Sequence, residues 1–542
     1  MPGPIRFTLL AGALLAAGSA SSAQQAPTPK REDSPVMRIP PVGPSASMWR
    51  VDPETARAPI APRRFVARKT GVFAGRKLAY SVVAEDQVLH DTAGEPIGSI
   101  FSFSYLKEPA SGDEARPVLF IFNGGPGSSS LWLHMGVLGP RKVDFRDVTP
   151  AQVPPFRLAD NPDSALAVAD LVFIDPIGTG FSRFWGKGQA KDFYGREEDA
   201  AASVQFINAW LRKHHRWNSP KFLLGESYGT TRANLVARRL MGGFLDGTLK
   251  GVSLNGVILV GGDGGLAKPA GNDSFLVTFT TMAATAWYHD RVDKAGRSFD
   301  QFIAEADRFA RDELVPALDK GDALDPAAMA AVARRHASFS GLSEAYVLSK
   351  KLRVMPSDYN SALLSDRGEM LGQYDSRYVL PARGSLGDPV ADDPAMGQYS
   401  APFIGAFNHY VRDELGVDID DDYVVIDWVN VNLPWNHGGK ATSGVTPFNQ
   451  GDGDPGADLA AMMRRNPDLR LMSIQGWFDM FGAVGTAQYG IAQRQLPADR
   501  VTAKAYLSGH MAYVGEAGLQ MAADLKDFIV RASQPASRGA AQ

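Results

Sequence analysis

Short apolar runs alternate with longer amphipathic stretches along most of this 542-residue chain. Buried strands are predicted for the runs 118–122, 171–174, 222–224, 257–260 and 469–474, and earlier strands for 78–85 and 97–106. Residues 197–212 carry apolar side chains at helical spacing and form the clearest of several predicted helices. Strands that alternate with helices predict an α/β fold, with a mainly parallel central sheet flanked by helices on both faces.

The pattern changes between about residues 273 and 420, where helical stretches follow one another. Asp325-Pro326 is typical of an N-cap and first helical residue, and predicts a helix over 327–336. We expect 273–420 to be a helical cap inserted over the carboxyl edge of the sheet, where it would roof the substrate site. Four of its aromatic residues either line a pocket or form the core of the cap, and the core is the favoured prediction: Trp287, Tyr288, Tyr374 and Tyr378.

The segments on either side of the cap belong to one split catalytic core. Residues 51–272 and 421–535 are predicted to form the two parts of this core, followed by a short tail over 536–542. Residues 24–50 are rich in proline, alanine and serine, which predicts a flexible arm.

The pentapeptide Gly225-Glu226-Ser227-Tyr228-Gly229 stands between a predicted strand and a helix-like stretch. Small residues two positions either side of the serine allow the sharp turn of a nucleophile elbow, which holds the hydroxyl clear of the backbone at a helix N-terminus. The same short motif occurs in ordinary turns, so its meaning depends on the flanking strand and helix. Both are predicted here, which makes Ser227 the candidate nucleophile of a hydrolase.

A glycine-rich stretch, Asn123-Gly124-Gly125-Pro126-Gly127, follows the predicted strand 118–122. In a hydrolase of this plan, one N–H of such a loop and the N–H after the nucleophile stabilise the oxyanion of the tetrahedral intermediate. Gly125 and Tyr228 are the candidates for this oxyanion hole. A phosphate-binding loop fits less well, because no lysine follows at the required spacing and the glycines do not read G-x-G-x-x-G.

Four motifs resemble those of the serine carboxypeptidase family, in the same order along the chain. They are NGGPG at 123–127, DPIGTGFS at 175–182, GESY at 225–228 and GHM at 509–511. The resemblance covers roughly residues 70–530. It implies an α/β-hydrolase fold, a peptidase that needs no cofactor, and peptides with a free C-terminus as substrates.

The acid and the histidine of such a hydrolase follow the nucleophile in the chain. Asp479 follows the predicted strand 469–474 and matches the family's glycine-x-x-aspartate, and His510 lies in the GHM motif. The resemblance therefore implies a triad of Ser227, His510 and Asp479, in which the histidine transfers a proton and the aspartate fixes its tautomer. The other histidines are predicted to be surface or structural residues.

The resemblance also assigns recognition of the substrate's terminal carboxylate to Asn123 and Glu226. A glutamate next to an anion makes sense only if one carboxyl is protonated, and like charges in a secluded site raise each other's pKa. Many family members carry a second glutamate where this chain has Val137. That departure leaves strict C-terminal specificity and an acid optimum open. His134 is a weak candidate to replace the glutamate, because a lone histidine is usually structural.

Residues 1–23 have the pattern of a secretory signal peptide, with Arg6 before an apolar stretch over 7–17 and a predicted cleavage after Ala23. The apolar stretch is too short to span a membrane, so no stable membrane association is expected. The chain contains no cysteine, which excludes disulfides, a thiolate metal site and a lipoprotein anchor. An exported chain of this kind fits a bacterial periplasmic or secreted protein.

A formal net charge of -3, with 21% charged residues, gives neither a polybasic nor an acidic signature, so no nucleic-acid partner is expected. Acidic residues at 418–422 and at Asp452 and Asp454 lack the twelve-residue pattern of a calcium loop. We predict that they lie in solvated loops and that the protein binds no metal.

Two further functions use the same residues differently. An esterase, amidase or acyltransferase would act through the same triad, and the absence of a glutamate at Val137 keeps this alternative open. A binding protein on an inactive hydrolase scaffold is disfavoured, because the triad and the oxyanion loop are all present in the sequence.

Overall fold

The computed structural model describes residues 61–108, 115–145, 147–148, 152–243, 248–438, 454–481 and 484–534. These all belong to the unit Val51–Gln542, whereas the unit Met1–Arg50 lies outside the described residues. The signal peptide predicted at 1–23, the arm predicted at 24–50 and the tail predicted at 536–542 therefore lie outside the described residues.

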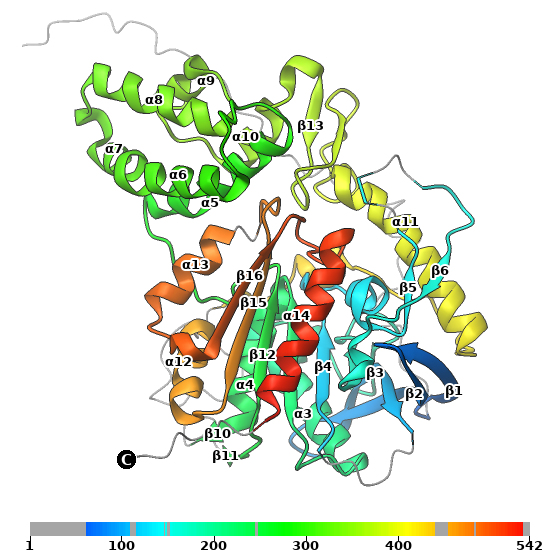
Figure 1. The fold of residues 1–542 in the computed structure, drawn as a ribbon. Helices are drawn as coiled ribbons and strands as arrows, with labels where there is room; N and C mark the ends of the chain where they lie inside the picture. The colour runs from blue at the N-terminus through cyan, green and yellow to red at the C-terminus, as the bar shows by residue number, and fades with distance from the viewer. Residues whose placement is uncertain are drawn as a thin grey trace, which may run out of the picture. The chain divides into compact units, whose positions relative to one another are not determined.

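A ten-stranded sheet forms the centre of the described part of the chain (Figure 1). Nine strands follow the order β1-β2-β3-β7-β4-β9-β12-β15-β16, and β8 pairs with β3. From β7 to β16 all neighbouring strands are parallel, whereas β1, β2 and β3 pair in antiparallel fashion and join the rest through β7. The strands are β1 Arg64–Phe73, β2 Arg76–His90, β3 Pro96–Lys107, β4 Val118–Phe122, β7 Asp170–Ile174, β8 Arg183–Phe184, β9 Lys221–Glu226, β12 Gly256–Val260, β15 Arg470–Gly476 and β16 Val501–Tyr506.

The central strands are buried on both faces. Leu119 and Ile121 of β4 belong to one apolar cluster, whereas Val118, Phe120 and Phe122 belong to another. Successive side chains of a strand point to opposite faces, so each strand supplies both clusters. This double burial explains why the strands appear in the sequence as continuous apolar runs, and it confirms the predicted α/β fold with a mainly parallel sheet.

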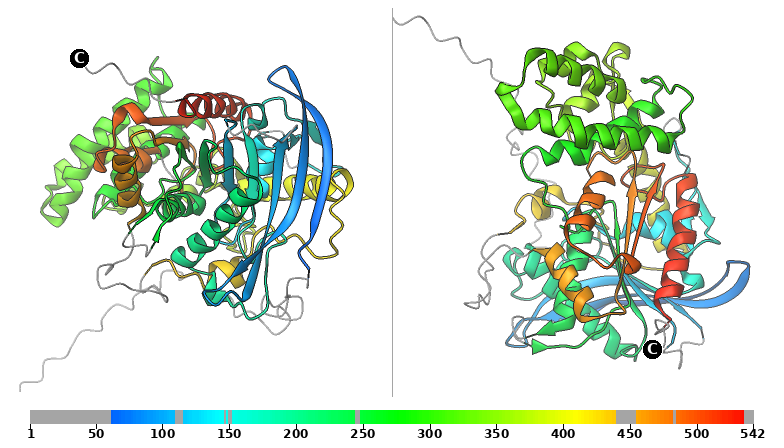
Figure 2. Two further views of the ribbon diagram at one scale, coloured as in Figure 1. Left: turned by 90° about the horizontal axis from the view of Figure 1, so that it is seen from below. Right: turned by 60° about the vertical axis from the view of Figure 1, so that its left-hand side comes forward.

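Helices cover the two faces of the sheet (Figures 1 and 2). On one face, α3 (Arg196–Lys213), α4 (Tyr228–Met241) and α12 (Pro455–Arg465) contribute to the cluster that contains Phe120. On the other face, α14 (Glu516–Ala532) contributes Met521 and Leu525 to the cluster that contains Ile121. α3 matches the helix predicted at 197–212. None of the described helices has the length and apolar character needed to cross a bilayer.

The segment between β12 and β15 contains most of the remaining helices; Figure 1 shows α5 to α10 gathered beyond one end of the sheet and α11 running alongside it. They are α5 Asp273–Tyr288, α6 Phe299–Phe309, α7 Val315–Lys320, α8 Pro326–Ser340, α9 Glu344–Ser349, α10 Pro356–Ala362 and α11 Pro394–His409. Asp325 caps α8 by accepting hydrogen bonds from the backbone of Ala327 and Ala328, which confirms the predicted start of this helix. α13 (Val484–Gln493), in the core after β15, packs against α5.

This segment divides between two apolar clusters. Helices α5 to α10 share a cluster with Phe478 and Met480, which directly follow β15 and so attach these helices to the carboxyl end of the sheet. α11 instead packs Tyr399 and Phe403 into the cluster around Ile121 in the core. A short hairpin of β13 (Glu369–Leu371) and β14 (Val379–Pro381) lies between the two parts.

The four aromatic residues expected in the core of the cap have different surroundings. Trp287 packs against the cluster of helices α5 to α10, whereas Tyr288 is 40% exposed. Tyr378 is buried in the other cluster, together with α11. Tyr374 lines the cavity described below. The core prediction therefore holds for Trp287 and for Tyr378, which packs against Tyr399 of α11, and is wrong for Tyr288 and Tyr374.

Candidate active site

A cavity of about 70 Å³ lies where the carboxyl ends of the parallel strands meet. Its polar side contains most of the residues singled out from the sequence: Asn123, Gly124, Gly125, Glu226, Ser227 and His510. Ser128 also lines the cavity, and the rest of the lining, called here its apolar side, is formed by Trp132, Tyr374, Met396, Ile426, Trp428 and Met511. β4, β9, β15 and β16 are neighbours or near neighbours in the sheet, and the loops after them hold the predicted site residues.

Ser227 occupies a strained turn between β9 and α4. Its φ is 58° and its ψ is -128°, a region that a residue with a side chain rarely adopts unless its surroundings impose it. α4 begins at Tyr228, so the serine hydroxyl stands at the N-terminus of a helix, where backbone N–H groups have no partner within the helix. The strand, turn and helix required for a nucleophile elbow are all present.

The glycine-rich loop after β4 lies against the start of α4. A Cβ atom on Gly124 would be 2.5 Å from the backbone nitrogen of Tyr228, so only glycine permits this close approach. The next residue, Gly125, has a φ of 99° and lines the cavity. The loop that carries Gly125 is therefore next to the Tyr228 N–H, as two donors that act on one oxygen require.

His510 and Asp479 form a buried pair. His510 Nδ1 lies 2.8 Å from Asp479 Oδ2, and the two residues are 5% and 0% exposed. The backbone N–H of Phe481 donates to Asp479 Oδ1 at 2.8 Å, which fixes the carboxylate plane. Burial opposes the charged form of His510, but the adjacent Asp479 carboxylate raises the histidine pKa above its ordinary value. Asp479 thus holds the imidazole of His510 through Nδ1, which leaves Nε2 as the nitrogen that can act as a general base.

Glu226 and Asn123 form a second buried pair on the polar side of the cavity. The amide Nδ2 of Asn123 donates to Glu226 Oε2 at 2.5 Å. The backbone N–H of Leu133 donates to Asn123 Oδ1 at 3.2 Å, and so determines which end of the amide faces the glutamate. Both side chains are buried, yet both residues border the cavity.

Burial raises the pKa of Glu226 to about 7. The positive charge of His510 and the hydrogen bonds from Tyr513 and Asn123 act in the opposite direction, while the charge of Asp479 raises the pKa further. Repulsion between like charges, the cause expected from the sequence, is thus the smallest of these effects. Desolvation keeps Glu226 protonated up to neutral pH, so a carboxyl group that can donate a hydrogen bond borders the cavity.

Residues 373–376 connect the two loops that carry Asp479 and His510. The N–H of His510 donates to the carbonyl of Tyr374 at 2.7 Å, and the N–H of Met480 donates to the carbonyl of Gln373 at 3.1 Å. The N–H of Ser376 donates to the carbonyl of Phe478 at 3.0 Å. This connecting segment belongs to the insertion, so the insertion positions the histidine and the aspartate as well as covering them.

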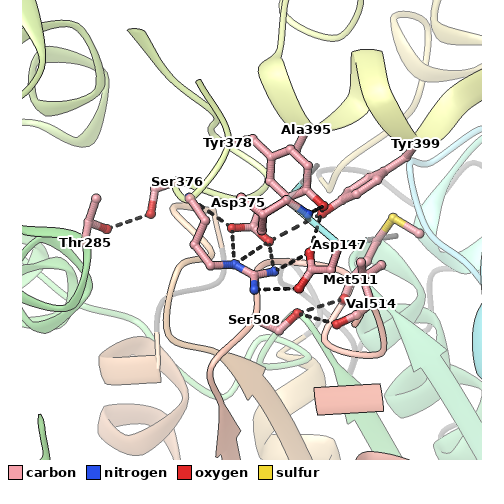
Figure 3. Close-up of polar contacts among 12 residues, drawn as sticks. Asp147, Thr285, Asp375, Ser376, Tyr378, Ala395, Tyr399, Ser508, Met511 and Val514 are labelled. Atoms are coloured by element: carbon pink, nitrogen blue, oxygen red, sulfur yellow. Dashed lines mark hydrogen bonds and ion pairs between the residues drawn. The ribbon is translucent and has the colours of Figure 1, made fainter. Parts of the chain in front are cut away.

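A buried charge cluster holds the connecting segment in place (Figure 3). Arg377 donates to Asp375 at 2.6 and 3.0 Å and to Asp147 at 2.8 and 3.1 Å. The phenol of Tyr378 donates to Asp147 at 2.8 Å. Figure 3 shows the two carboxylates close to Ser508 and Met511, on either side of His510 in the chain. The cluster therefore joins three separate segments next to the histidine.

A buried arginine, Arg232, contacts both the glycine-rich loop and the start of α4. Arg232 of α4 is fully buried and pairs with Asp199 of α3 at 2.6 Å. Its Nη1 donates to the backbone carbonyl of Asn123 at 2.6 Å, and its guanidinium lies 5.3 Å from the ring centroid of Tyr228. The glycine-rich loop and the start of α4 therefore share one support.

His134 does not border the cavity. It is 1% exposed and stacks on Phe173 with 4.1 Å between ring centroids, and its Nε2 lies 2.5 Å from the hydroxyl of Tyr105. Burial lowers the His134 pKa to about 3, which leaves the ring neutral. His134 is a structural residue, as the sequence favours, and does not replace the missing glutamate.

No cluster of His, Asp or Glu side chains in the described ranges has the arrangement of a metal site. Asp454 caps α12 and pairs with Arg494 at 2.9 Å, so it has a structural role instead of lying in a purely solvated loop. Asp452 lies outside the described residues.

Two tyrosines contribute to the site: Tyr374, for which the sequence favoured the core over a pocket, and Tyr513, which the sequence did not indicate. Tyr374 lines the cavity, and its ring lies 5.4 Å from the ring of His510. Tyr513 donates from its phenol to Glu226 Oε2 at 2.9 Å. Neither belongs to a motif. The one available signal was that Tyr513 follows the GHM motif by two residues, and this proximity does not indicate the direction of the side chain.

Comparison with known proteins adds an independent line of support. Residues 100–313 match the family profile described as serine carboxypeptidase. The serine carboxypeptidase ctsa-3.1 of Caenorhabditis elegans is 35% identical over 127 residues, which are 23% of this chain and 20% of that protein. The pheromone-processing carboxypeptidase kex1 of Pyrenophora tritici-repentis is 32% identical over 148 residues, which are 27% of this chain and 21% of that protein. The chain therefore spans about a fifth of the length of these curated relatives.

A solved structure resembles the chain over a longer range. The crystal structure of Kex1(delta)p, a prohormone-processing carboxypeptidase from Saccharomyces cerevisiae, aligns with a TM-score of 0.50. The alignment covers 83% of this chain and 91% of that chain at 15% identity. At this identity the likeness concerns the fold, and it agrees with the α/β-hydrolase architecture described above.

Proposed function

This chain belongs to the serine carboxypeptidase family, and from that premise we propose that it removes the C-terminal residue of peptides through an acyl-enzyme on Ser227. One observation carries the proposal. The cavity that contains Ser227 and His510 also contains a carboxyl group with a pKa near neutrality and a fixed amide, on Glu226 and Asn123. A general esterase has no need for such a pair, whereas a peptidase that acts on free C-termini does.

The proposed mechanism assigns one proton path to the triad. His510 takes the proton of Ser227 as the serine oxygen attacks the scissile carbonyl carbon, and then delivers it to the leaving amine. Asp479 keeps the proton on Nδ1 of the neutral histidine and stabilises the imidazolium that forms. The N–H groups of Gly125 and Tyr228 receive the negative charge of the tetrahedral intermediate. Water then releases the acyl group by the same steps in reverse.

Asn123 and protonated Glu226 are proposed to hold the terminal carboxylate of the substrate. A neutral carboxyl group donates a hydrogen bond to an anion, whereas an ionised one would repel it at close range. The Asn123 amide donates to Glu226 Oε2 and also interacts with the phenol of Tyr513, so it holds the carboxyl group in place beside the substrate. Asn123, Glu226 and Ser227 line the same small cavity, so a carboxylate held by the first two is proposed to lie close to the bond that Ser227 attacks.

The apolar side of the cavity is proposed to select apolar side chains next to the scissile bond. Trp132, Ile426 and Trp428 line it, and burying an apolar side chain there removes its surface from water. Charged side chains would lose hydration without gaining a partner.

The proposal is tested with N-blocked dipeptides that have apolar side chains, each prepared with a free and with an amidated C-terminus. We expect kcat/KM to be at least about a hundredfold higher for the free acid. Its terminal carboxylate is an anion that accepts a strong hydrogen bond from Glu226, whereas the amidated C-terminus is neutral and accepts a weaker one. Equal rates on both forms, or hydrolysis of ester substrates alone, would assign the triad to esterase, amidase or acyltransferase chemistry.

The pH dependence of kcat/KM on a free-acid peptide is expected to be bell-shaped. On the alkaline side, activity falls as pH rises through about 7, because Glu226 loses its proton and then repels the substrate. On the acid side, activity falls as His510 gains a proton, and this fall begins at a higher pH than for an ordinary histidine because its pKa is raised. Replacement of the carboxyl by an amide in Glu226→Gln removes the alkaline fall.

The same variant makes a second, independent prediction. The neutral amide of Glu226→Gln resembles the protonated carboxyl that prevails below neutral pH, so the variant should move the acid limb, which reports His510, only slightly. Profiles of kcat/KM against pH for wild type and variant, measured over about pH 4–9, test both predictions. A variant with an unchanged alkaline limb would remove Glu226 from the carboxylate site.

The proposed location is the periplasm or the extracellular space of a bacterium. It rests on the signal-peptide pattern over 1–23 and on the absence of cysteine. N-terminal sequencing of the exported protein should begin at Gln24, whereas an uncleaved N-terminus in the cytoplasm would contradict it.

A further inference from the structure

The phenol of Tyr513 contacts Glu226, which lines the cavity, from the loop that carries His510. Its hydroxyl donates to Glu226 Oε2 at 2.9 Å, and the amide of Asn123 donates to the same oxygen at 2.5 Å. Tyr513 is 3% exposed and Glu226 is also 3% exposed. Two donors therefore occupy one oxygen of the glutamate, and among the described residues no hydrogen bond reaches the other oxygen, Oε1.

This arrangement decides where the glutamate carries its proton. An oxygen that accepts two hydrogen bonds is the less basic position, so the proton of the neutral carboxyl belongs on Oε1. We propose that Tyr513 is a positioning residue for Glu226: its hydroxyl occupies Oε2 and thereby directs the protonated Oε1 toward the terminal carboxylate of the substrate. The inference rests on the proposed carboxypeptidase function and adds a residue to its recognition site.

The chain makes room for the tyrosine ring at two neighbouring positions. A Cβ atom on Gly136 would lie 2.4 Å from Cε2 of Tyr513, so the ring fits only against a glycine. The next residue, Val137, stands where the family resemblance leads one to expect a glutamate, and it lines with Tyr513 a second cavity of about 750 Å³. The phenol of Tyr513 thus supplies a polar contact to Glu226, whereas Val137 has no polar side-chain group to offer.

The electrostatics of the site give the tyrosine a measurable effect. The titratable groups that act on Glu226 are Tyr513, His510, Asp479 and Tyr374. Burial raises the pKa of Glu226 to about 7, and the hydrogen bond from Tyr513 lowers it relative to burial alone. Burial also raises the pKa of Tyr513 well above its ordinary value, so the phenol keeps its proton and acts only as a donor. Loss of the hydroxyl is therefore expected to raise the pKa of Glu226.

The test compares wild type with Tyr513→Phe, which keeps the ring against Gly136 and removes only the hydroxyl. The pKa of Glu226 is measured directly by ¹³C NMR of the carboxyl carbon in glutamate-labelled protein, with the signal assigned by its loss in Glu226→Gln. We expect the pKa to move upward by about one pH unit, the shift that corresponds to one lost hydrogen bond to a charged group. A pKa that stays within about 0.2 of the wild-type value would overturn the proposal.

Kinetics supply the readout that a merely structural role would not change. In Tyr513→Phe, kcat/KM on a free-acid dipeptide should fall about tenfold, mainly through KM, whereas hydrolysis of its methyl ester should change less than about twofold. The alkaline limb of the free-acid profile should move upward with the pKa of Glu226. Equal losses on acid and ester, or no loss on either, would also contradict the proposed role.

Two further variants separate this role from general damage to the loop. Tyr506→Phe is the matched control, because Tyr506 is 5% exposed, lines the same second cavity and donates from its hydroxyl to Asp524 at 2.7 Å. It should leave the pKa of Glu226 and the acid-to-ester ratio unchanged. Gly136→Ala should reproduce the effect of Tyr513→Phe, because its methyl group displaces the ring.

Failure of this inference is distinguishable from failure of the proposed function. If the wild type does not prefer free acids over amides, the carboxypeptidase proposal is wrong, and the tyrosine has no substrate carboxylate to serve. If the wild type shows the preference but Tyr513→Phe leaves both the preference and the pKa of Glu226 unchanged, only the role of Tyr513 is wrong.

Discussion

Ser227→Ala is expected to lower kcat on peptide substrates by about six orders of magnitude, because no other group can form the acyl-enzyme. The turn itself should persist, since alanine keeps the Cβ atom and the serine makes no side-chain cap to α4. The loss is measured as product release from an N-blocked dipeptide, with circular dichroism to verify the fold. A fluorophosphonate probe should label the wild type at Ser227 and leave the variant unlabelled.

Ser203→Ala is the matched control for this result. Ser203 is 2% exposed on α3 and is not among the residues that line the cavity. Its replacement should leave kcat within about twofold of wild type, since it touches none of the reacting groups. Activity of Ser227→Ala within about tenfold of wild type would show that the reaction does not use this serine. Full-rate labelling of His510→Ala by the probe would contradict the role of the histidine.

Arg377→Met is expected to destabilise the protein by about 3–5 kcal/mol, the largest effect on stability that the structure implies. The substitution keeps most of the side-chain volume but leaves two carboxylates, on Asp375 and Asp147, without their shared cation. Asp375 is fully buried, and burial already raises its pKa, so removal of the nearby positive charge leaves its ionised form strongly disfavoured. The change is measured as the free energy of unfolding in urea.

Activity should fall with stability in this variant, because Arg377 adjoins the segment 373–376 that connects the loops of Asp479 and His510. Arg311→Met serves as the control: Arg311 pairs with Asp307 at 2.8 Å, but its side chain is 46% exposed. An exposed pair of this kind contributes about 0.3–0.5 kcal/mol, so the control should scarcely change the unfolding free energy. Similar losses of unfolding free energy in the two variants would show that the buried cluster around Arg377 stabilises the protein no more than an exposed ion pair does.

The sequence predicted the elements whose signals are local. Runs such as 118–122 and 257–260 are recognisable because strands buried on both faces consist almost entirely of apolar residues. The start of α8 was predictable because Asp325 and Pro326 act on the backbone within three residues of themselves. The strand, turn and helix around Ser227 follow from the same kind of short-range constraint.

The parts that escaped prediction depend on contacts between distant segments. Nothing near Tyr374 in the sequence indicates that its carbonyl accepts a hydrogen bond from His510, since that bond exists only after the insertion folds back onto the sheet. The same holds for Tyr513, whose partner Glu226 lies 287 residues away. β1 was missed because its side chains alternate between exposed and half-buried, which gives too weak an apolar signal.

The electrostatic cause at Glu226 shows a third limit. The sequence suggested repulsion between the glutamate and the carboxylate that it would bind in a secluded site. In the structure, burial is the main cause of the raised pKa, with Asp479 as the weakest contributor. Burial depends on the packing of the whole site, which spacing along the chain does not reveal. The sequence therefore pointed to a protonated glutamate, but not to the desolvation that raises its pKa in the structure.

The most direct test of the account follows a single N-acetylated peptide of about ten apolar and polar residues by mass spectrometry, in its free-acid and amidated forms. The account predicts a ladder from the free acid in which residues leave one at a time from the C-terminus, and no ladder from the amide or from Ser227→Ala. Internal cleavage, or equal shortening of the amide, would contradict a carboxypeptidase that recognises the terminal carboxylate through Asn123 and Glu226.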